Sequence, residues 1–325
     1  MNAVLRTIRR PSLWLHLGFA CAVGALAFTR IGRMAGVLPQ PVDVDLAPGE
    51  AMKVEGTVLA LKRFSIPRYA SGSPKQYVSE LHRMAHGSAG GVEDVSISVN
   101  HPLLCDGWWV YQSSWGEDSR GKYTVLRSVR DPFLPLAFAG WAMLLAGSLM
   151  LAVDHWRRTA AAEAAAARRW WPYAAAAVLS AFPVYFIGRS VLKPDLMPAL
   201  QSPLLFPHIL AYLFSYVIFL FAAFGLLRRL WGAAYFLMTL GLVLGALWGK
   251  ICWSEWWQFD PKEMWSLCTW LAYGFCFHVK YLPVKSPETK RKLQKGLLIA
   301  GAVLVVLTLA WVNFSRLFSG LHSYA

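Results

Sequence analysis

Six of the chain's 16 tryptophans fall within residues 248–270. Trp253, Trp256 and Trp257 have the spacing that places side chains on one face of a helix. Such a face offers a large, flat aromatic surface, which suits a planar ligand. The same residues could instead form an interfacial belt, because tryptophan gathers at the water–lipid boundary of membrane proteins.

The same stretch contains the signal for a helix start. Asp260 is a suitable N-cap, Pro261 suits the first helical position, and Glu263 stands where a capping-box acid belongs. We therefore expect a helix to begin at Pro261, with its first turn beside the aromatic surface. Capping is the simplest role for Asp260, and contact with a bound ligand is the alternative.

Four of the eight histidines fall into two groups by position. His208 and His322 flank apolar segments on the side of residues 248–270, whereas His16 and His278 lie inside apolar segments near the other ends. Imidazoles serve as axial ligands of haem iron, and an ionisable residue within a membrane span is a functional candidate. From position alone, a hydrogen-bonded packing residue is the commoner role for each.

Other candidate groups are weaker. His155 competes with His16 as the partner of His278, although its charged neighbours indicate a solvated residue; His16 is chosen by depth alone. His82 and His86 have the i,i+4 spacing of a helical metal pair, but the Gly-Ser-Ala-Gly-Gly that follows favours a loop. Five cysteines without a C-x-x-C exclude a thioredoxin-like motif and covalent haem attachment to this chain. A bridge between Cys105 and Cys252 stays open.

The elements that position these residues are apolar segments of membrane-spanning length. About 18 to 20 apolar residues are needed to cross the hydrocarbon as a helix. The sequence predicts seven such spans, over residues 12–29, 132–153, 172–191, 208–229, 232–250, 264–280 and 296–314. The first lacks a small-residue cleavage site, so we expect it to remain as a span.

The charges predict the orientation. A net charge of +14 would suggest nucleic-acid binding in a soluble protein, but here the Lys- and Arg-rich loops all fall on one side of the seven spans. By the positive-inside rule this side is cytoplasmic. We therefore expect a cytoplasmic N-terminus, with residues 248–270 and the C-terminus on the outer side, and no nucleic-acid partner.

Residues 34–131 form one polar insertion between the first two spans. Residues 54–61 and 95–99 have the composition of strands, and the second alternates with period two. Gly, Pro and Ser clusters separate them. The expected fold class is therefore a polytopic α-helical membrane protein, with about seven transmembrane helices and one small extracytoplasmic β-rich domain.

Residues 257–265 resemble the tryptophan-rich WWD signature, W-x-W-D-P-K-E-x-W, of haem-handling proteins in cytochrome c maturation, most closely the CcsA (ResC) type. Phe259 stands where that family usually has Trp and lacks the indole N–H donor. Residues 200–202 (Leu-Gln-Ser) before His208, and 320–324 (Gly-Leu-His-Ser-Tyr), are further features of this type. The resemblance implies that His208 and His322 are outer haem ligands.

The same resemblance extends to the inner histidines and to the ligand surface. His278 matches the CcsA-side member of a second haem-binding pair in the membrane, for which His16 is our choice of partner. The residues expected to contact the haem macrocycle or its surroundings are Trp253, Trp257, Phe259, Asp260 and Trp265.

Two pieces of the polar insertion resemble the ResB-type partner of this maturation system. They are residues 73–79, and residues 97–103 followed by residues 107–114. That family usually has more spans before its outer domain, so this chain would be a shortened version. The expected divisions are a first transmembrane helix (1–33), a ResB-like β domain (34–131), transmembrane helices 2 and 3 (132–192) and a CcsA-like haem-handling domain (193–325).

The resemblance implies a compact fusion acting as a System II cytochrome c synthase in a bacterial inner (plasma) membrane. It would bring haem b to the outer face for thioether attachment to a C-x-x-C-H apocytochrome, with a thiol reductant system as a further partner. No residue has the pattern of a catalytic nucleophile, so the chain would act by positioning haem. The alternative is a haem transporter or chaperone that forms no covalent bond.

Overall fold

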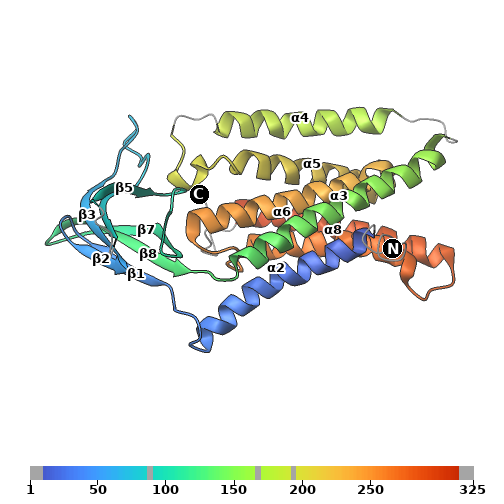
Figure 1. Cartoon of the computed structure of the whole chain (residues 1–325). Helices are drawn as coiled ribbons and strands as arrows, with labels where there is room; N and C mark the ends of the chain where they lie inside the picture. Colours follow the sequence, from blue (N-terminus) through green and yellow to red (C-terminus); the bar gives the residue numbers. More distant parts are fainter. Residues whose placement is uncertain (1–9, 86–90, 165–169, 192–194, 315–325) are drawn as a thin grey trace.

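The computed structural model describes residues 10–85, 91–164, 170–191 and 195–314. A bundle of long helices carries a small β domain at one end, and α2 and α3 both run from that domain to the far end of the bundle (Figure 1). Within the described residues, seven α-helices have 18 or more residues. They are α2 (Pro11–Met34), α3 (Leu134–Ala164), α4 (Trp171–Val191), α5 (Leu205–Ala223), α6 (Trp231–Trp253), α7 (Pro261–His278) and α8 (Pro287–Phe314).

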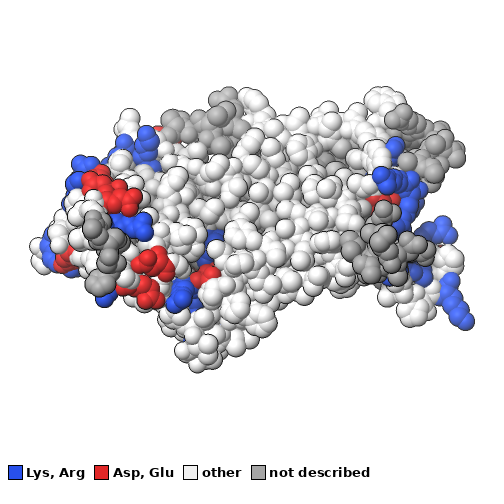
Figure 2. All heavy atoms as spheres, viewed as in Figure 1, with Lys and Arg blue, Asp and Glu red and all other residues white. Residues whose placement is uncertain are grey.

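Five of these helices, namely α2, α3, α5, α6 and α8, are long and apolar enough to cross a membrane. The multi-pass α-helical class is thus supported, but the predicted count of seven spans is not confirmed, because α4 and α7 are not among the five. On the face shown in Figure 2, charged side chains gather at the two ends and the middle of the bundle is largely free of charge. Such a belt suits the hydrocarbon core of a bilayer.

The β domain consists of two four-stranded antiparallel sheets, ordered β1-β8-β7-β6 and β2-β3-β4-β5. Residues from both sheets, among them Leu59, Ile97 and Leu126, pack into one buried cluster. The strands are β1 (Val42–Leu46), β2 (Ala51–Val54), β3 (Thr57–Ser65), β4 (Val78–Ala85), β5 (Glu93–Ser98), β6 (Leu103–Cys105), β7 (Trp108–Asp118) and β8 (Gly121–Arg130).

The first of the two predicted strands, residues 54–61, contains a turn and belongs to two strands. Residues 54–61 span the end of β2 and the start of β3, with Val54 paired to Thr57 and Glu55 in a left-handed conformation at φ 50°. Two-residue hairpin turns use such positive φ values. The turn was missed because residues that favour strands stand on both sides of it. The second predicted strand corresponds to β5.

His82 does not lie on a helix, as a metal pair with the i,i+4 spacing of His82 and His86 would require. His82 lies on β4, where Nδ1 is 2.6 Å from Asp94 Oδ1 on β5, and His86 lies outside the described residues. Hydrogen bonds from Lys62 and then from His82 hold the pKa of Asp94 below its ordinary value. Within the described part of the chain, no cluster of three or more His, Cys, Asp or Glu side chains is suited to a metal ion.

Glycines allow α2 and α3 to pack closely. A Cβ on Gly140 would lie 2.5 Å from the backbone nitrogen of Ala22, and one on Gly18 would lie 2.7 Å from that of Leu144. Small residues let helix backbones approach in this way in membranes. Because α2 precedes β1 and α3 follows β8, this contact ties the β domain to the bundle and seats α2, with His16, against α3.

The tryptophan-rich segment, residues 248–270, comprises the end of α6, the connection to α7 and the first part of α7. It is therefore not one helix. Helix α6 ends at Trp253, because Ser254 adopts a left-handed conformation at φ 69°. Trp256 and Trp257 follow in irregular backbone. The prediction that these three tryptophans share a helical face is therefore wrong.

The predicted start of α7 is confirmed. Asp260 Oδ1 accepts a hydrogen bond from the Lys262 backbone N–H (2.8 Å), and Glu263 Oε2 accepts from the Asp260 backbone N–H (3.3 Å). Pro261 is the first helical residue. A capping box satisfies backbone donors that a helix start leaves unpaired, so the end of the tryptophan-rich segment is held in one place.

Candidate functional site

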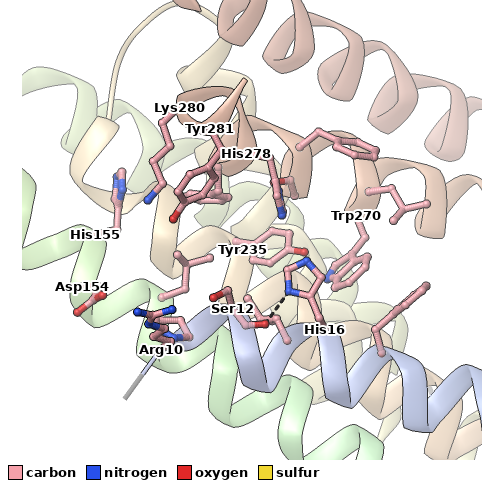
Figure 3. Close-up of a pocket in the computed structure, with 18 of the residues that line it drawn as sticks. Arg10, Ser12, His16, Asp154, His155, Tyr235, Trp270, His278, Lys280 and Tyr281 are labelled. Carbon is pink, nitrogen blue, oxygen red and sulfur yellow. Dashed lines mark hydrogen bonds between the residues drawn. The ribbon is translucent and has the colours of Figure 1, made fainter. Parts of the chain in front are cut away.

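One cavity, which we call the inner cavity, lies at the end of the bundle far from the β domain. It has a volume of about 810 Å³ and is bounded by α2, α3, α6, α7 and the turn after α7. His16, His155 and His278 all line it. Figure 3 shows the rings of His16 and His278 near each other in the middle of the cavity, with His155 on a different wall.

His16 and His278 are held in the same way by their own helices. His16 Nδ1 donates to the carbonyl of Ser12 (2.6 Å), and His278 Nδ1 donates to the carbonyl of Gly274 (2.9 Å). A carbonyl oxygen only accepts hydrogen bonds, so Nδ1 carries the proton and the lone pair of each neutral ring lies on Nε2. Metal-binding histidines are commonly oriented by this kind of backbone bond.

The spacing of the two rings suits an axial pair. Their centroids are 5.6 Å apart and their planes are perpendicular. A metal held between two imidazoles by bonds of about 2 Å separates the ring centres by about 6 Å. The observed separation is close to that value.

His155 is engaged elsewhere. Its Nε2 is 2.7 Å from the carbonyl oxygen of Arg228, and its ring stacks on Trp231 with centroids 6.3 Å apart. These contacts hold it at the junction of α3 and α6. The ring of His278 thus lies beside that of His16, whereas His155 contributes to another part of the cavity wall.

Aromatic rings make up the deep wall of this inner cavity. Trp270 stacks between Phe19 of α2 and Tyr235 of α6, at centroid distances of 5.7 and 5.5 Å. Its Nε1–H donates to Thr239 Oγ1 (2.9 Å), which satisfies the buried indole. The last tryptophan of residues 248–270 therefore lies at the inner cavity, on the same helix as Trp265 but further along it.

The second cavity, of about 410 Å³, lies towards the β-domain end and is lined by α5, α6, α7, α8 and the tryptophan-rich segment. His208 of α5 lies on its wall, with Tyr212, Trp248 and Trp257. His208 Nδ1 donates to the carbonyl of Gly241 (2.8 Å). As at His16 and His278, Nδ1–H donates to a backbone carbonyl, but this carbonyl belongs to the facing helix α6.

The other predicted contacts that the structure describes do not line this cavity, which we call the outer cavity. Trp253 packs on Trp248, which does line it, with centroids 5.4 Å apart. Phe259 is 53% exposed and lies under the Arg30 guanidinium at 4.6 Å. Asp260 caps α7, Trp265 is half-buried on that helix, and His322 lies outside the described residues.

Trp256 points into the protein core. Its Nε1–H donates to Asp131 Oδ2 (3.3 Å), and its ring meets Phe138 edge-on at 5.4 Å. The same Asp131 oxygen lies 2.9 Å from Lys250 Nζ, and these two side chains are only 5% and 7% exposed. A buried ion pair thus fastens the tryptophan-rich segment to the start of α3.

The β domain also contacts the chain just before His208. Asn100, at the turn after β5, donates to the carbonyl of Pro198 (2.8 Å) in the short helix η1 (Pro198–Gln201). Gln201 donates to the carbonyl of Lys75 (2.7 Å). These bonds join residues 73–79 and 97–103, which resemble ResB, to η1. This short helix contains Leu200 and Gln201 of the Leu-Gln-Ser piece before His208.

Sequence reasoning missed several cavity residues. Tyr212 and Tyr216 belong to an apolar helix, and nothing in their local sequence indicates a cavity. Gly245 could have been noticed, because it lies one helical turn from Gly241 in α6. Arg10, Arg158 and Lys280 line the inner cavity, and the positive-inside rule had explained them as loop charges.

In comparisons with known proteins, two family models match separate parts of the chain. Residues 225–322 match the family model described as Cytochrome C assembly protein, and residues 34–129 match the ResB-like family. A protein described as cytochrome c biogenesis protein CcsA from Prochlorococcus marinus (strain MIT 9303) is 36% identical over 90 residues, which is 28% of this chain and 26% of that protein.

A second relative of the same description, from Porphyra purpurea, is 34% identical over 96 residues, or 30% of this chain and 28% of that protein. The chain therefore aligns with about a quarter of the length of these curated relatives. With both family matches in one polypeptide, the chain is a membrane protein built from cytochrome c assembly families. More particularly, it is a fusion of a ResB-like part and a CcsA-type part of System II.

Proposed function

We propose that this protein is a cytochrome c synthase that takes up haem b at the inner cavity and presents it at the outer one. The acceptor is an apocytochrome with a C-x-x-C-H motif on the outer face of a bacterial plasma membrane. The observation that carries the proposal is the matched pair His16 and His278, whose Nε2 atoms are left for a ligand and whose rings are 5.6 Å apart.

At the inner site, His16 and His278 would be the axial ligands, and Phe19, Tyr235 and Trp270 would contact the macrocycle. The cavity volume of about 810 Å³ is in the range of sites for large cofactors. The basic end of the bundle supports a cytoplasmic position for this cavity, and with it a cytoplasmic N-terminus (Figure 2).

At the outer site, His208 and His322 would be the axial ligands. Trp257 would contact the macrocycle directly, because it lines the cavity with His208. Trp253, Phe259 and Trp265 would complete the aromatic surroundings, and Asp260 would hold the start of α7. Supporting this site, His208 donates Nδ1–H to a backbone carbonyl as the inner histidines do.

The chemistry needs positioning more than catalytic groups from the protein. Each apocytochrome thiol adds across one haem vinyl group, so that sulfur bonds to one vinyl carbon and the thiol hydrogen goes to the other. No electrons are gained or lost, but the thiols must be kept reduced by a separate reductant system. The protein's part is to orient haem beside the thiols and keep competing reactions away.

A co-expression experiment tests the proposal. In a host lacking its own maturation system, the protein with a C-x-x-C-H reporter should give a reporter that stains for covalent haem. His278→Gly should lower that yield and added imidazole should partly restore it, whereas His155→Gly should retain more activity than His278→Gly. Protein that loads haem but never yields covalent reporter would identify a transporter instead.

A further inference from the structure

Three cations surround one end of the inner cavity. Arg10 precedes α2, Arg158 lies in the last turns of α3, and Lys280 lies in the short helix η3 (Val279–Tyr281) that follows α7. They come from three separate segments, and all three line the same cavity as His16 and His278.

Resting on the proposed function, we propose that Arg10, Arg158 and Lys280 bind the two propionate carboxylates of haem at the inner site. They would thereby select a dianionic macrocycle and set its orientation there. This role is separate from iron ligation, because it depends on the carboxylates and not on the metal.

The cavity has a polarity gradient that fits such a ligand. Figure 3 shows Arg10, Asp154, His155 and Lys280 on one side, the two facing imidazoles in the middle and Trp270 on the other side. Haem has the same distribution, with propionates on one edge and apolar substituents, including the vinyl groups, towards the other. Its propionates would then point to the surface and its vinyl edge to Phe19 and Trp270.

The cations are free to change partners. Arg158 is paired with Asp154 at 3.0 Å, but the two side chains are 66% and 40% exposed. An exposed pair of this kind contributes little stability, so a propionate can replace or share the Asp154 contact. Lys280 Nζ lies 4.7 Å from the ring centre of Tyr281, and the carbonyl of Lys280 accepts from Lys290, which ties the turn to α8.

The general positive charge of this end does not explain the placement. Arg157 is the neighbour of Arg158 on the same helix and Lys285 lies in the following loop, yet neither lines the cavity. The positive-inside rule requires only that Lys and Arg lie on the cytoplasmic side of the membrane, not that they line a cavity. Arg157 is therefore a matched control, with the same charge and helix but no cavity contact.

The test compares haem b with its dimethyl ester, in which both carboxylates are neutral. Binding is titrated to full-length purified protein stripped of haem, in a His208→Ala, His322→Ala background that leaves the inner histidines. The parent should bind haem more tightly than the ester. Arg10→Gln, Arg158→Gln and Lys280→Gln should each weaken haem binding by about threefold to tenfold, as for partly exposed charge-assisted contacts. Ester binding should change by less than about twofold on the same scale.

The triple variant should bind haem no more tightly than the ester, and Arg157→Gln should alter neither affinity. A triple variant that keeps the parent's preference for haem, or that loses both ligands equally, would overturn the carboxylate site. His278→Gly separates the two proposals. If it leaves the affinity for both macrocycles unchanged, iron ligation at this cavity is wrong, whatever the cation variants do.

Discussion

Three histidines in separate helices form the same kind of hydrogen bond to a backbone carbonyl. In His16, His208 and His278, Nδ1 donates to a backbone carbonyl at 2.6 to 2.9 Å. Each ring is thereby held in one orientation with its lone pair on Nε2, which reduces the ordering that a metal must impose. His155 instead uses Nε2 for its carbonyl bond, so the lone pair of its neutral ring lies on Nδ1.

The position of His208 depends on a glycine in the facing helix. A Cβ on Gly245 would lie 2.7 Å from His208 Cε1 and 2.9 Å from Nδ1. Gly245→Ala should displace the ring at a cost of about 1 to 3 kcal/mol, as for an overpacked core. We expect a loss of outer-site haem, measured as haem per protein after purification of a His278→Gly background that lacks the inner ligand.

Gly296→Ala is the control, because a Cβ there meets nothing within 4 Å. Equal haem content in the Gly245→Ala and Gly296→Ala proteins would show that the close contact with His208 has no part in the outer site.

Trp257 and Asp260 have different roles although they are three residues apart. Trp257→Ala removes part of the cavity wall, worth about 1 to 3 kcal/mol for a large apolar side chain, so haem should dissociate faster with its absorption spectrum unchanged. Asp260→Asn should preserve haem retention, since Asn caps a helix about as well as Asp. A changed spectrum in Trp257→Ala, or faster haem loss in Asp260→Asn, would reverse these assignments.

At the residue scale, sequence reasoning found what local chemistry determines. The capping box at Asp260 and Glu263 follows from side chains that bond to backbone a few residues away, so spacing alone predicts it. The common helical face of Trp253 and Trp257 failed because one residue, Ser254, takes a left-handed conformation that its type does not signal. The cavity role of Tyr212 comes from packing between helices and has no signature in the sequence.

Among the elements, α7 connects the two cavities. Its first two turns carry Glu263 and Ser266 on the outer cavity, and its last turn carries His278 on the inner one. Eighteen helical residues rise by about 27 Å. One helix therefore sets the separation of the two proposed sites.

The buried pair Lys250–Asp131 links the tryptophan-rich segment to α3. Lys250 Nζ also donates to the carbonyl of Ser254 (3.0 Å), and Asp131 accepts from Trp256. Lys250→Met leaves a buried carboxylate without its cation, which should lower the free energy of unfolding by about 3 to 5 kcal/mol. Lys250→Met with Asp131→Leu should recover much of that loss, because no buried charge is left unpaired.

Denaturing-detergent titration of the purified variants measures both free energies. A double variant no more stable than Lys250→Met would mean that the pair stabilises the protein through its further bonds to Ser254 and Trp256.

Helix positions could be predicted largely from hydropathy, because the bilayer requires long apolar segments. The structure adds polar turns to them: α3 continues to Ala164 and α8 begins at Pro287, well before the apolar residues. Hydropathy could not predict these extensions, since a helix that leaves the membrane no longer needs apolar side chains. Nor could it predict the pairing of the eight strands, which depends on contacts between distant residues.

For the whole molecule, the N-terminal part and the C-terminal part meet at the β-domain end of the bundle. Asn100 and Gln201 join the β domain to the segment before His208, and Asp131 and Lys250 join α3 to the tryptophan-rich segment. The outer cavity is thus held from both parts. The inner cavity likewise takes His16 from the N-terminal part and His278 from the C-terminal part, so neither part alone contains a complete site.

The optical spectrum of protein carrying only the inner histidines tests the central claim most directly. His208→Ala, His322→Ala protein, purified from haem-replete cells, should show a Soret band and the six-coordinate, low-spin spectrum of two imidazole ligands. Adding His278→Gly should abolish that spectrum, and imidazole should restore it, whereas His155→Gly should leave it intact. Well-folded protein without a Soret band, or a six-coordinate spectrum that survives both His16→Gly and His278→Gly, would contradict the account.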